Sequence, residues 1–280
     1  MKDGLEYIPK ELINTLSKDK YPNLIEYCQI INEQIWNDKI KNKYENTAQT
    51  IDERILEEML QIENEKFKNI RQEANLTDDT NEIIRTIKNY SKNNKTLIIT
   101  SGLPGSGKSH FVKKHFPDNH VNMDDELNKL ANLYEKATEG DKITGRLENY
   151  INSQIEKEIG KKLRKESIII DSVNSTKKER QEKYNQYNKN DYQYNKRICF
   201  LFDSQSQTCY ERMQIRKKDP PTQIYHLSSL IYFLLRFESP LKNDLKPEIG
   251  LDLILTTDTK GDIKSAYPIE TYEKIKPTIN

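Results

Sequence analysis

Apolar residues in the first ninety positions recur at the spacing of amphipathic helices. The clearest series is Ile51, Ile55, Met59 and Ile62, whose members lie three or four residues apart. Glycine, which weakens helices, is almost absent from this region. A polar run before position 80 predicts a turn and an N-cap for a further helix over about 80–90. We therefore expect an all-helical N-terminal region, residues 1–92, that serves as a cap or docks a protein partner.

From position 96 the pattern changes to short apolar runs that alternate with helical stretches. Strands that alternate with helices imply a parallel sheet with helices on both faces. We expect an α/β domain over residues 93–280 with a five-stranded parallel sheet. The expected strands are 96–101, 119–122, Ser167–Asp171, Arg197–Phe202 and Leu251–Thr256, and the expected helices are 108–116, 125–136, 144–165, 176–189, 206–216 and 223–237.

The turn between the first strand and the first helix of this domain carries a complete phosphate-binding motif, G-x-x-x-x-G-K-S. Its glycines let successive backbone N–H groups converge on a phosphate, and the helix N-terminus adds partial positive charge. Lys108 would reach the β- and γ-phosphates, and the Ser109 hydroxyl would ligate Mg²⁺. The sequence thus predicts a P-loop kinase core that binds ATP or GTP with Mg²⁺. The expected nucleotide-binding residues are Gly102, Leu103, Pro104, Gly105, Ser106, Gly107, Lys108, Ser109 and His110.

Two carboxylates follow strands at the edge where ligands bind in open α/β sheets. Asp124 comes after the second strand, where it could accept the proton of an attacking hydroxyl or simply cap the next helix. Asp171 ends the third strand in a Walker-B-like element, Ile168-Ile169-Ile170-Asp171, and would lie near Mg²⁺ or the acceptor hydroxyl. The alternative for Asp171 is an aspartate in an ordinary turn.

Arg212 and Arg216 lie four residues apart on the helix after the fourth strand, so they share one helix face. Prolines at 220 and 221 end this stretch. A mobile lid with two arginines could close over the triphosphate and neutralise charge in the transition state. The alternative is a solvated basic surface.

The overall composition adds limits. Forty-five basic and 44 acidic side chains give a net charge of +1, which is no strong footprint for a long nucleic acid. The three cysteines form no C-x-x-C pair, and three of the four histidines are spaced by five, which fits neither a helix face nor a zinc finger. We see no signal peptide and no apolar run long enough to span a membrane, so we expect a cytoplasmic protein.

Taken together, residues 96–258 resemble the polynucleotide 5′-kinase family in its bacteriophage T4-like P-loop branch. The resemblance rests on several short motifs in the same order. They are G-x-P-G-S-G-K-S at 102–109, Asn122-x-Asp124-Asp125, Ile-Ile-Asp-x-x-Asn at 169–174, Arg180, Arg212-x-x-x-Arg216, and Phe237-Glu238-Ser239-Pro240.

The resemblance implies transfer of the γ-phosphate of a nucleoside triphosphate to a hydroxyl, which in known members is the 5′-OH of DNA or RNA. Lys108 and Ser109 would then serve phosphate and magnesium, and Asp124 would be the general base. On the acceptor side it implies Asp171, Asn174 and Arg180, and it makes Arg216 the main lid arginine with Arg212 in support.

One departure bears on the acceptor. The family has an arginine three residues after the base, where it helps to hold nucleic acid, and this chain has Leu127 there. A zeta-toxin-like kinase of small molecules such as nucleotide sugars is therefore a second reading, although the Asp171-x-x-Asn174 spacing fits the first family better. A third reading is a non-catalytic, nucleotide-gated binding protein whose effector surface is the N-terminal helices.

Overall fold

The computed structural model describes residues 8–36, 53–68, 70–71, 74–122, 153–154, 157, 161, 167–188, 194–216, 222–242 and 244–276. The expected helix at 125–136 lies outside these residues, and so does most of the one expected at 144–165. The helices are α1 Lys10–Ile13, α2 Pro22–Trp36, α4 Glu53–Phe67, α5 Thr80–Asn93, α6 Lys108–His115, α9 Lys177–Asn188, α10 Ser206–Arg216, α11 Thr222–Arg236 and α12 Ile269–Ile275. The strands are β1 Thr96–Ser101, β2 His120–Asn122, β3 Ile168–Asp171, β4 Lys196–Phe202, β5 Leu253–Thr257 and β6 Ile263–Tyr267.

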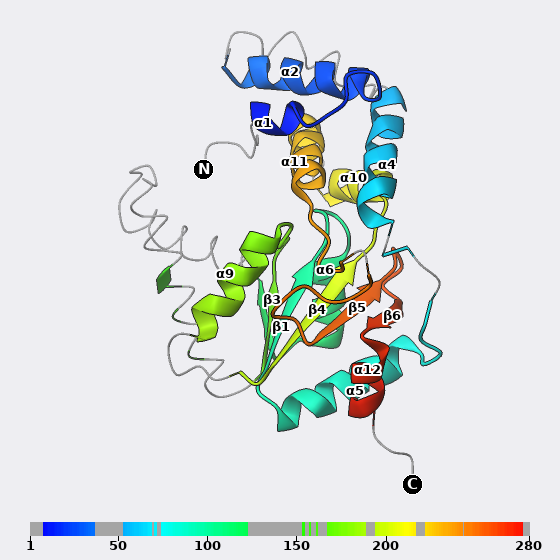
Figure 1. The fold of residues 1–280 in the computed structure, drawn as a ribbon. Helices are drawn as coiled ribbons and strands as arrows, with labels where there is room; N and C mark the ends of the chain where they lie inside the picture. The colour runs from blue at the N-terminus through cyan, green and yellow to red at the C-terminus, as the bar shows by residue number, and fades with distance from the viewer. Residues whose placement is uncertain are drawn as a thin grey trace.

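The centre of the molecule is a six-stranded sheet in the order β2-β3-β1-β4-β5-β6 (Figure 1). Strands β1 to β5 run parallel, so the expected five-stranded parallel sheet is confirmed. A sixth strand, β6, pairs antiparallel with β5 and extends the sheet at one edge. The sequence analysis does not predict β6.

The central strands of the sheet are buried on both faces, and their apolar side chains alternate between two hydrophobic clusters. In β1, Leu97 and Ile99 join one hydrophobic cluster, and Ile98 joins the other. This alternation follows from the two-residue period of a strand. Every residue of β1 and β3 is buried. Strands of this kind read as continuous apolar runs, which explains why the sequence locates them well.

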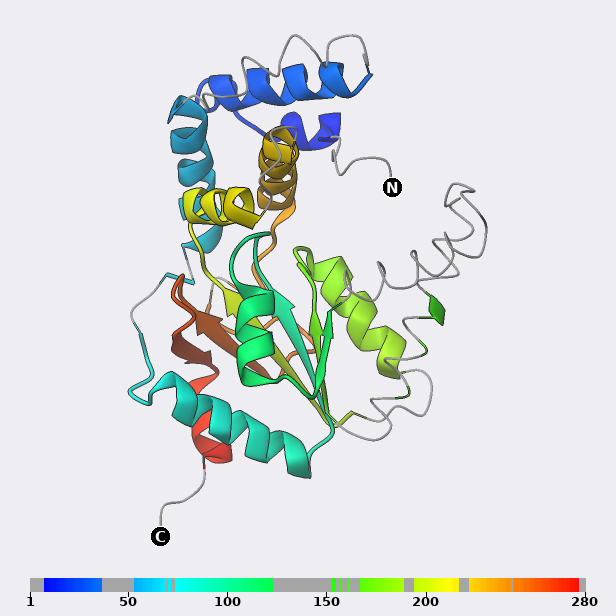
Figure 2. The ribbon, with the colours of Figure 1, turned by 180° about the vertical axis from the view of Figure 1, so that it is seen from behind.

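Helices α5 and α6 cover one face of the sheet, and α9 covers the other (Figures 1 and 2). The first face packs against Ile83 and Ile87 of α5, Phe111 of α6 and Tyr272 of α12. Asp79 caps α5, because its carboxylate accepts hydrogen bonds from the backbone N–H groups of residues 81 and 82. The expected N-cap in this stretch is therefore confirmed.

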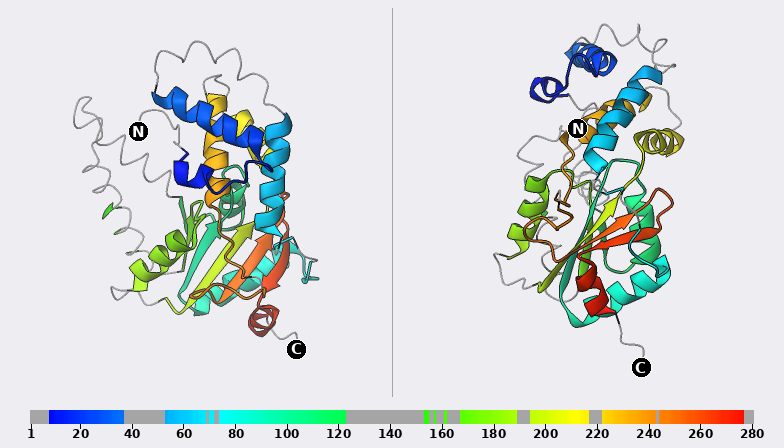
Figure 3. Two further views of the ribbon diagram at one scale, coloured as in Figure 1. Left: turned by 45° about the horizontal axis from the view of Figure 1, so that its top comes forward. Right: turned by 45° about the vertical axis from the view of Figure 1, so that its right-hand side comes forward.

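The remaining helices form a second layer beyond the carboxyl ends of the strands (Figure 3). Here α4 packs against α2, α10 and α11. The buried Glu58 of α4 ties α2 to it, since its carboxylate accepts hydrogen bonds from the backbone N–H groups of Asn23 (3.2 Å) and Leu24 (2.7 Å) at the start of α2. A negative charge at a helix N-terminus is stabilising.

One hydrophobic core crosses the boundary expected at residue 92. The cluster that contains Met59 and Phe67 of α4 also contains Leu97 of β1 and Leu230 of α11. The helix α5, from the same N-terminal region, packs on the opposite face of the sheet. The N-terminal helices therefore share their core with the α/β part of the chain. In the part of the chain that the structure describes, no helix is both long and apolar enough to cross a membrane.

Candidate active site

The phosphate-binding motif folds as the sequence predicts, between the end of β1 and the start of α6. Gly107 caps α6 in a left-handed conformation, with φ of 99°. The buried Lys108 side chain lies along the loop, and its Nζ donates hydrogen bonds to the carbonyl oxygens of Gly102 (3.0 Å) and Leu103 (2.7 Å). The ammonium group is thus held inside the ring of backbone that would surround a phosphate.

Two of the loop glycines are required by close packing. A Cβ at Gly105 would lie 2.4 Å from the carbonyl oxygen of Cys209 in α10, and one at Gly102 would lie 2.8 Å from that of Phe202 at the end of β4. Both positions also have positive φ, which disfavours any side chain. The loop is therefore pressed against β4 and α10, and its shape depends on both elements.

The side chains of Ser109, Asn122 and Asp171 meet beside this loop. The Asn122 amide donates a hydrogen bond to Asp171 Oδ2 (2.8 Å), and its Nδ2 lies 3.4 Å from Ser109 Oγ. Asn122 and Asp171 are brought together because β2 and β3 pair in a register that sets them opposite each other. The structure thus gathers residues from the ends of three segments that are far apart in the sequence.

Asp171 is buried, and its surroundings favour the ionised form of its carboxyl group. Burial alone would raise the pKa of this carboxyl, but hydrogen bonds from His120 and Ser109 and the positive charge of Lys108 outweigh it, so the pKa lies below its ordinary value. A buried carboxylate that stays ionised suits a role next to a cation. This is the environment that a Walker-B aspartate requires.

His120 is a member of this cluster that sequence reasoning missed as a functional residue. Its Nε2 lies 3.4 Å from Asp171 Oδ2, and its side chain is only 10% exposed. The available signal was the spacing, because His120 and Asn122 are two residues apart in a strand and therefore share a face.

The donors of this cluster fit a magnesium ion. Mg²⁺ takes oxygen ligands, and it usually keeps water and substrate phosphates in its shell alongside one or two protein groups. Ser109 Oγ and the Asp171 carboxylate are such oxygens, both within reach of the same Asn122 amide. No cluster of three or more His, Cys, Asp or Glu side chains suited to a metal occurs within the described ranges, so a closed all-protein metal site is not seen there.

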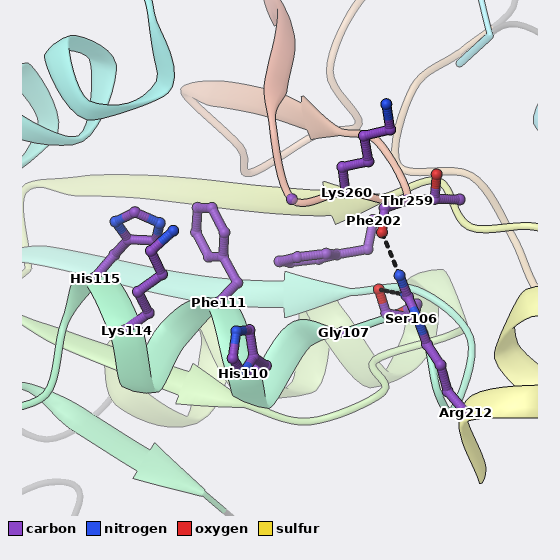
Figure 4. Close-up of a pocket in the computed structure, with 11 residues that line it drawn as sticks. Ser106, Gly107, His110, Phe111, Lys114, His115, Phe202, Arg212, Thr259 and Lys260 are labelled. Carbon is purple, nitrogen blue, oxygen red and sulfur yellow. Dashed lines mark hydrogen bonds between the residues drawn. The ribbon is translucent and has the colours of Figure 1, made fainter. Parts of the chain in front are cut away.

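A pocket of about 350 Å³ opens next to the loop, between α6 and the turn that joins β5 to β6 (Figure 4). Phe111 and Phe202 form its apolar floor, with ring centroids 5.3 Å apart in an edge-to-face pair. Ser106 and Gly107 lie at one end, and Lys114 and His115 lie at the other. The sequence analysis included His110, Ser106 and Gly107 among nucleotide-binding residues but missed the aromatic floor and the Thr259–Gly261 wall.

Arg212 lies where the pocket meets the loop. Its guanidinium donates hydrogen bonds to the carbonyl oxygens of Ser106 (3.4 Å) and Thr259. The structure therefore places Arg212 beside the phosphate loop. The backbone of Arg216 ends α10, one helical turn further on, but its side chain is outside the described atoms.

Asn174 and Arg180, which the resemblance assigns to the acceptor, have contacts within the protein. Asn174 is buried with φ of 45°, and its amide donates a hydrogen bond to the carbonyl oxygen of Thr100 (2.8 Å). Arg180 is fully buried and forms a two-bond ion pair with Glu248, with N–O distances of 2.8 and 2.7 Å. Neither side chain faces solvent, and both hold the β3–α9 turn, so their role toward an acceptor stays a prediction.

The expected general base, Asp124, lies outside the described residues, as does Leu127. The structure places Asn122, two residues before Asp124, at the end of β2 and next to Ser109. The role of Asp124 therefore stays a prediction.

The comparison with protein families agrees with this fold. A family model described as an AAA domain matches residues 97–230, from β1 through the phosphate loop into α11. No curated protein matches.

Among solved structures, a chain of the Pnkp1/Rnl/Hen1 RNA repair complex matches at 24% identity over 51% of this chain and 46% of its own, with a TM-score of 0.37. This chain therefore spans less than half the length of that protein. A gluconokinase from Sinorhizobium meliloti 1021 matches at 12% identity, over 59% of this chain and 83% of its own, with a TM-score of 0.34.

A putative kinase from Chloroflexus aurantiacus matches at 15% identity, over 59% of this chain and 85% of its own, with a TM-score of 0.39. The sheet topology and the phosphate loop of this chain, together with the family match, define an α/β, P-loop kinase-like fold.

Proposed function

We propose that this protein is a kinase that transfers the γ-phosphate of ATP or GTP to a hydroxyl group, with Mg²⁺ as cofactor. The observation that carries the proposal is the convergence of Ser109, Asn122 and the ionised Asp171 on one side of the phosphate loop, with Lys108 inside it. A simple phosphate-binding loop does not need a buried carboxylate beside it, whereas phosphoryl transfer with a cation does.

The nucleotide would lie with its phosphates in the loop and its base in the adjoining pocket. The Phe111 and Phe202 rings offer an apolar surface for a flat base, and Ser106 and Gly107 lead from the pocket to the loop. The volume of the pocket, about 350 Å³, is at the lower end of the range for small-ligand sites.

In this proposal each group of the site has a specific role in phosphate transfer. Lys108 and the loop N–H groups bind the β- and γ-phosphates, and Arg212 and Arg216 neutralise the charge that develops during transfer. Ser109 and Asp171 would hold Mg²⁺, which supplies further positive charge at the phosphates. Asp124 removes the proton of the attacking hydroxyl.

For the acceptor, we propose the 5′-OH of a polynucleotide or nucleotide. The support is the resemblance of the Asn122-x-Asp124-Asp125 and Asp171-x-x-Asn174 segments to the polynucleotide 5′-kinase pattern. A small-molecule acceptor such as a nucleotide sugar is the competing outcome, because Leu127 replaces the arginine that would hold nucleic acid.

The test is a transfer assay with γ-labelled ATP or GTP and Mg²⁺ against 5′-OH RNA, 5′-OH DNA, nucleosides and nucleotide sugars. Labelled oligonucleotide supports the proposal, and labelled nucleotide sugar identifies the competing acceptor. We expect Lys108→Ala to abolish transfer, while Lys113→Ala, on the exposed side of the same helix, retains it. Nucleotide binding by the wild-type protein without transfer to any acceptor would favour the nucleotide-gated binding protein.

A further inference from the structure

The two helices α10 and α11 form an arm that leaves the sheet after β4 and returns to it after Arg236. Helix α4, from the N-terminal region, contacts both junctions of this arm. Figure 3 shows α4 running beside α10 and α11 in the layer beyond the strands. The two junctions are held by different chemistry.

At the first junction the holding group is Glu63, whose side chain is fully buried. Its carboxylate accepts hydrogen bonds from the backbone N–H of Ser206 (2.6 Å) and from the Ser206 hydroxyl, at the first residue of α10. Arg71 pairs with the same carboxylate and donates from Nε to both oxygens of Asp203 (3.0 Å), in the link between β4 and α10. The start of α10 is therefore hydrogen-bonded to α4, and the link before α10 is ion-paired with Arg71 in the segment that follows α4.

At the second junction the holding group is Lys66. Its Nζ donates hydrogen bonds to the carbonyl oxygens of Leu235 (2.8 Å) and Phe237 (3.0 Å), at the C-terminal end of α11. The Phe67 ring stacks on Phe237, with centroids 4.4 Å apart and an interplanar angle of 13°. Burial lowers the pKa of Lys66, and the negative charge of Glu238 opposes this effect in part.

The charges match the helix ends that they meet. A carboxylate is stabilising at the N-terminus of α10, and an ammonium group is stabilising at the C-terminus of α11. Glu63 and Lys66 are three residues apart, so they share one face of α4. A single helical turn thus holds both ends of the arm.

The first junction is close to the phosphate loop. Ser204 donates a hydrogen bond to the carbonyl oxygen of Ser106 (3.1 Å), and the backbone of Cys209 limits residue 105 of the loop to glycine. Arg212 lies six residues after Ser206, about 9 Å along the helix axis. A shift at the start of α10 would therefore move Arg212 relative to the phosphates.

We propose that Glu63 and Lys66 are positioning residues, through which α4 braces both ends of the α10–α11 arm and fixes Arg212 beside the phosphate loop. This inference rests on the proposed kinase function for its catalytic consequence. It gives the N-terminal helices a defined role in the site, and it places the arm in its working position before any nucleotide binds.

The brace itself is tested by hydrogen exchange on the full chain, without reference to activity. The variants are Glu63→Gln and Lys66→Met, and the control is Glu65→Gln, an exposed carboxylate on the same helix that contacts Lys20 (3.5 Å) and the Tyr21 hydroxyl (3.3 Å). We expect faster amide exchange at the start of α10 in the first variant and at the end of α11 in the second. Exchange in β1 and β3 should not change.

Unchanged exchange in the arm, or an equal increase in the sheet, would overturn the brace. Arg71→Met, which removes a partly exposed side chain from the same network, provides a milder variant if Glu63→Gln does not fold. It should raise exchange at the same amides of α10.

The catalytic consequence is tested by a double-mutant cycle with Arg212→Ala. Small misplacements of catalytic groups can cost about 100-fold, so we expect Glu63→Gln to lower kcat by about 10- to 100-fold while the Kd for nucleotide changes little. In the Arg212→Ala background the same substitution should have less than about a twofold further effect, because coupled residues are not additive. Multiplicative effects would refute positioning through Arg212. If the wild-type protein transfers no phosphate, the proposed function fails, and the exchange experiment still decides whether α4 holds the arm.

Discussion

The side chains around the phosphate loop divide into those that would touch the nucleotide and those that hold the loop in shape. Under the proposed function Lys108 belongs to the first group, together with Ser109 and Asp171, which would act there through Mg²⁺. Asn174 and Arg180 are buried and hydrogen-bonded to protein groups, and they support the β3–α9 turn beside the loop. A sequence motif does not distinguish residues that contact the ligand from residues that support the site, because both are needed for the site to form.

The first residue-scale prediction concerns the general base. Asp124→Asn removes the group that would accept the proton of the attacking hydroxyl, and a positioned base contributes about 10²- to 10⁴-fold. We expect kcat to fall on that scale, while the affinity for ATP stays near the wild-type value, as measured by titration. Asp125→Asn is the matched control and should have a small effect. A loss of thermal stability with normal turnover would instead identify Asp124 as a helix cap.

The second concerns the pH dependence of stability, through His115 at the far end of the pocket. Burial, together with the charges of Lys114 and Lys88, lowers the pKa of His115 below 6.5. The unfolded chain then binds this proton more tightly than the folded protein does, so the free energy of unfolding falls as the pH drops below about 6.5.

We expect His115→Gln to reduce that dependence. The measurement is urea denaturation of both proteins at pH 7.5 and 5.5, comparing the change in free energy of unfolding between them. Equal losses in the two proteins would show that His115 does not titrate differently on folding.

At the scale of elements, helix α10 carries the two arginines that we propose contact the transition state. Arg212 and Arg216 lie one turn apart on it, and Arg212 already contacts the phosphate loop. We expect Arg212→Ala and Arg216→Ala to lower kcat more than they raise the KM for ATP, because an interaction made only in the transition state appears in kcat. Lys218→Ala, beyond the end of α10, should do much less. Equal and mild effects of all three would indicate a solvated basic surface.

The five parallel strands could be predicted from the sequence, and the antiparallel edge strand β6 could not. The bounds of β1 and α10 agree with the prediction to the residue, because β1 has an apolar centre between β-prone threonines and α10 lies between a strand and two prolines. Strand β6 was missed because Ile263–Tyr267 is short and carries a lysine at its second position. Its Asp258–Asp262 turn, with Gly261 at φ of 90°, was the signal that could have revealed a hairpin.

The candidate site could likewise be predicted only in part from the sequence. The phosphate loop and Asp171 follow from local motifs, whereas the aromatic pocket joins Phe111, Phe202 and the 259–261 turn, which come together only through the sheet order. The spacing of these residues along the chain does not indicate that they lie close together in the fold.

At the scale of the whole molecule, the continuous core makes a prediction about unfolding. Met59 of α4 is fully buried in the cluster that also contains Leu97 of β1. Met59→Ala should therefore destabilise the entire chain, by about 2–5 kcal/mol as for other large-to-small core substitutions. The neighbouring Leu60 is 42% exposed, and Leu60→Ala should cost about 0.5 kcal/mol or less.

The measurement is denaturation followed by the fluorescence of the single tryptophan, Trp36, and by far-UV circular dichroism. We expect the two probes to report one transition in the wild type and in Met59→Ala, with the midpoint lowered in the variant. Two separate transitions, with only the Trp36 signal shifted by the substitution, would show that residues 1–92 fold independently.

The turn between β5 and β6 supplies one wall of the pocket, and this has a consequence for how nucleotide preference can change. The phosphate loop is locked by backbone contacts with α10, whereas Thr259–Gly261 belong to an exposed hairpin turn, the kind of segment that accepts substitutions and insertions. Under the proposed function, side-chain substitutions in this turn would alter which base is accepted, whereas insertions would also displace the Thr259 carbonyl oxygen that accepts a hydrogen bond from Arg212. Base preference and phosphate transfer would therefore be linked through the backbone of one turn, and independent through its side chains.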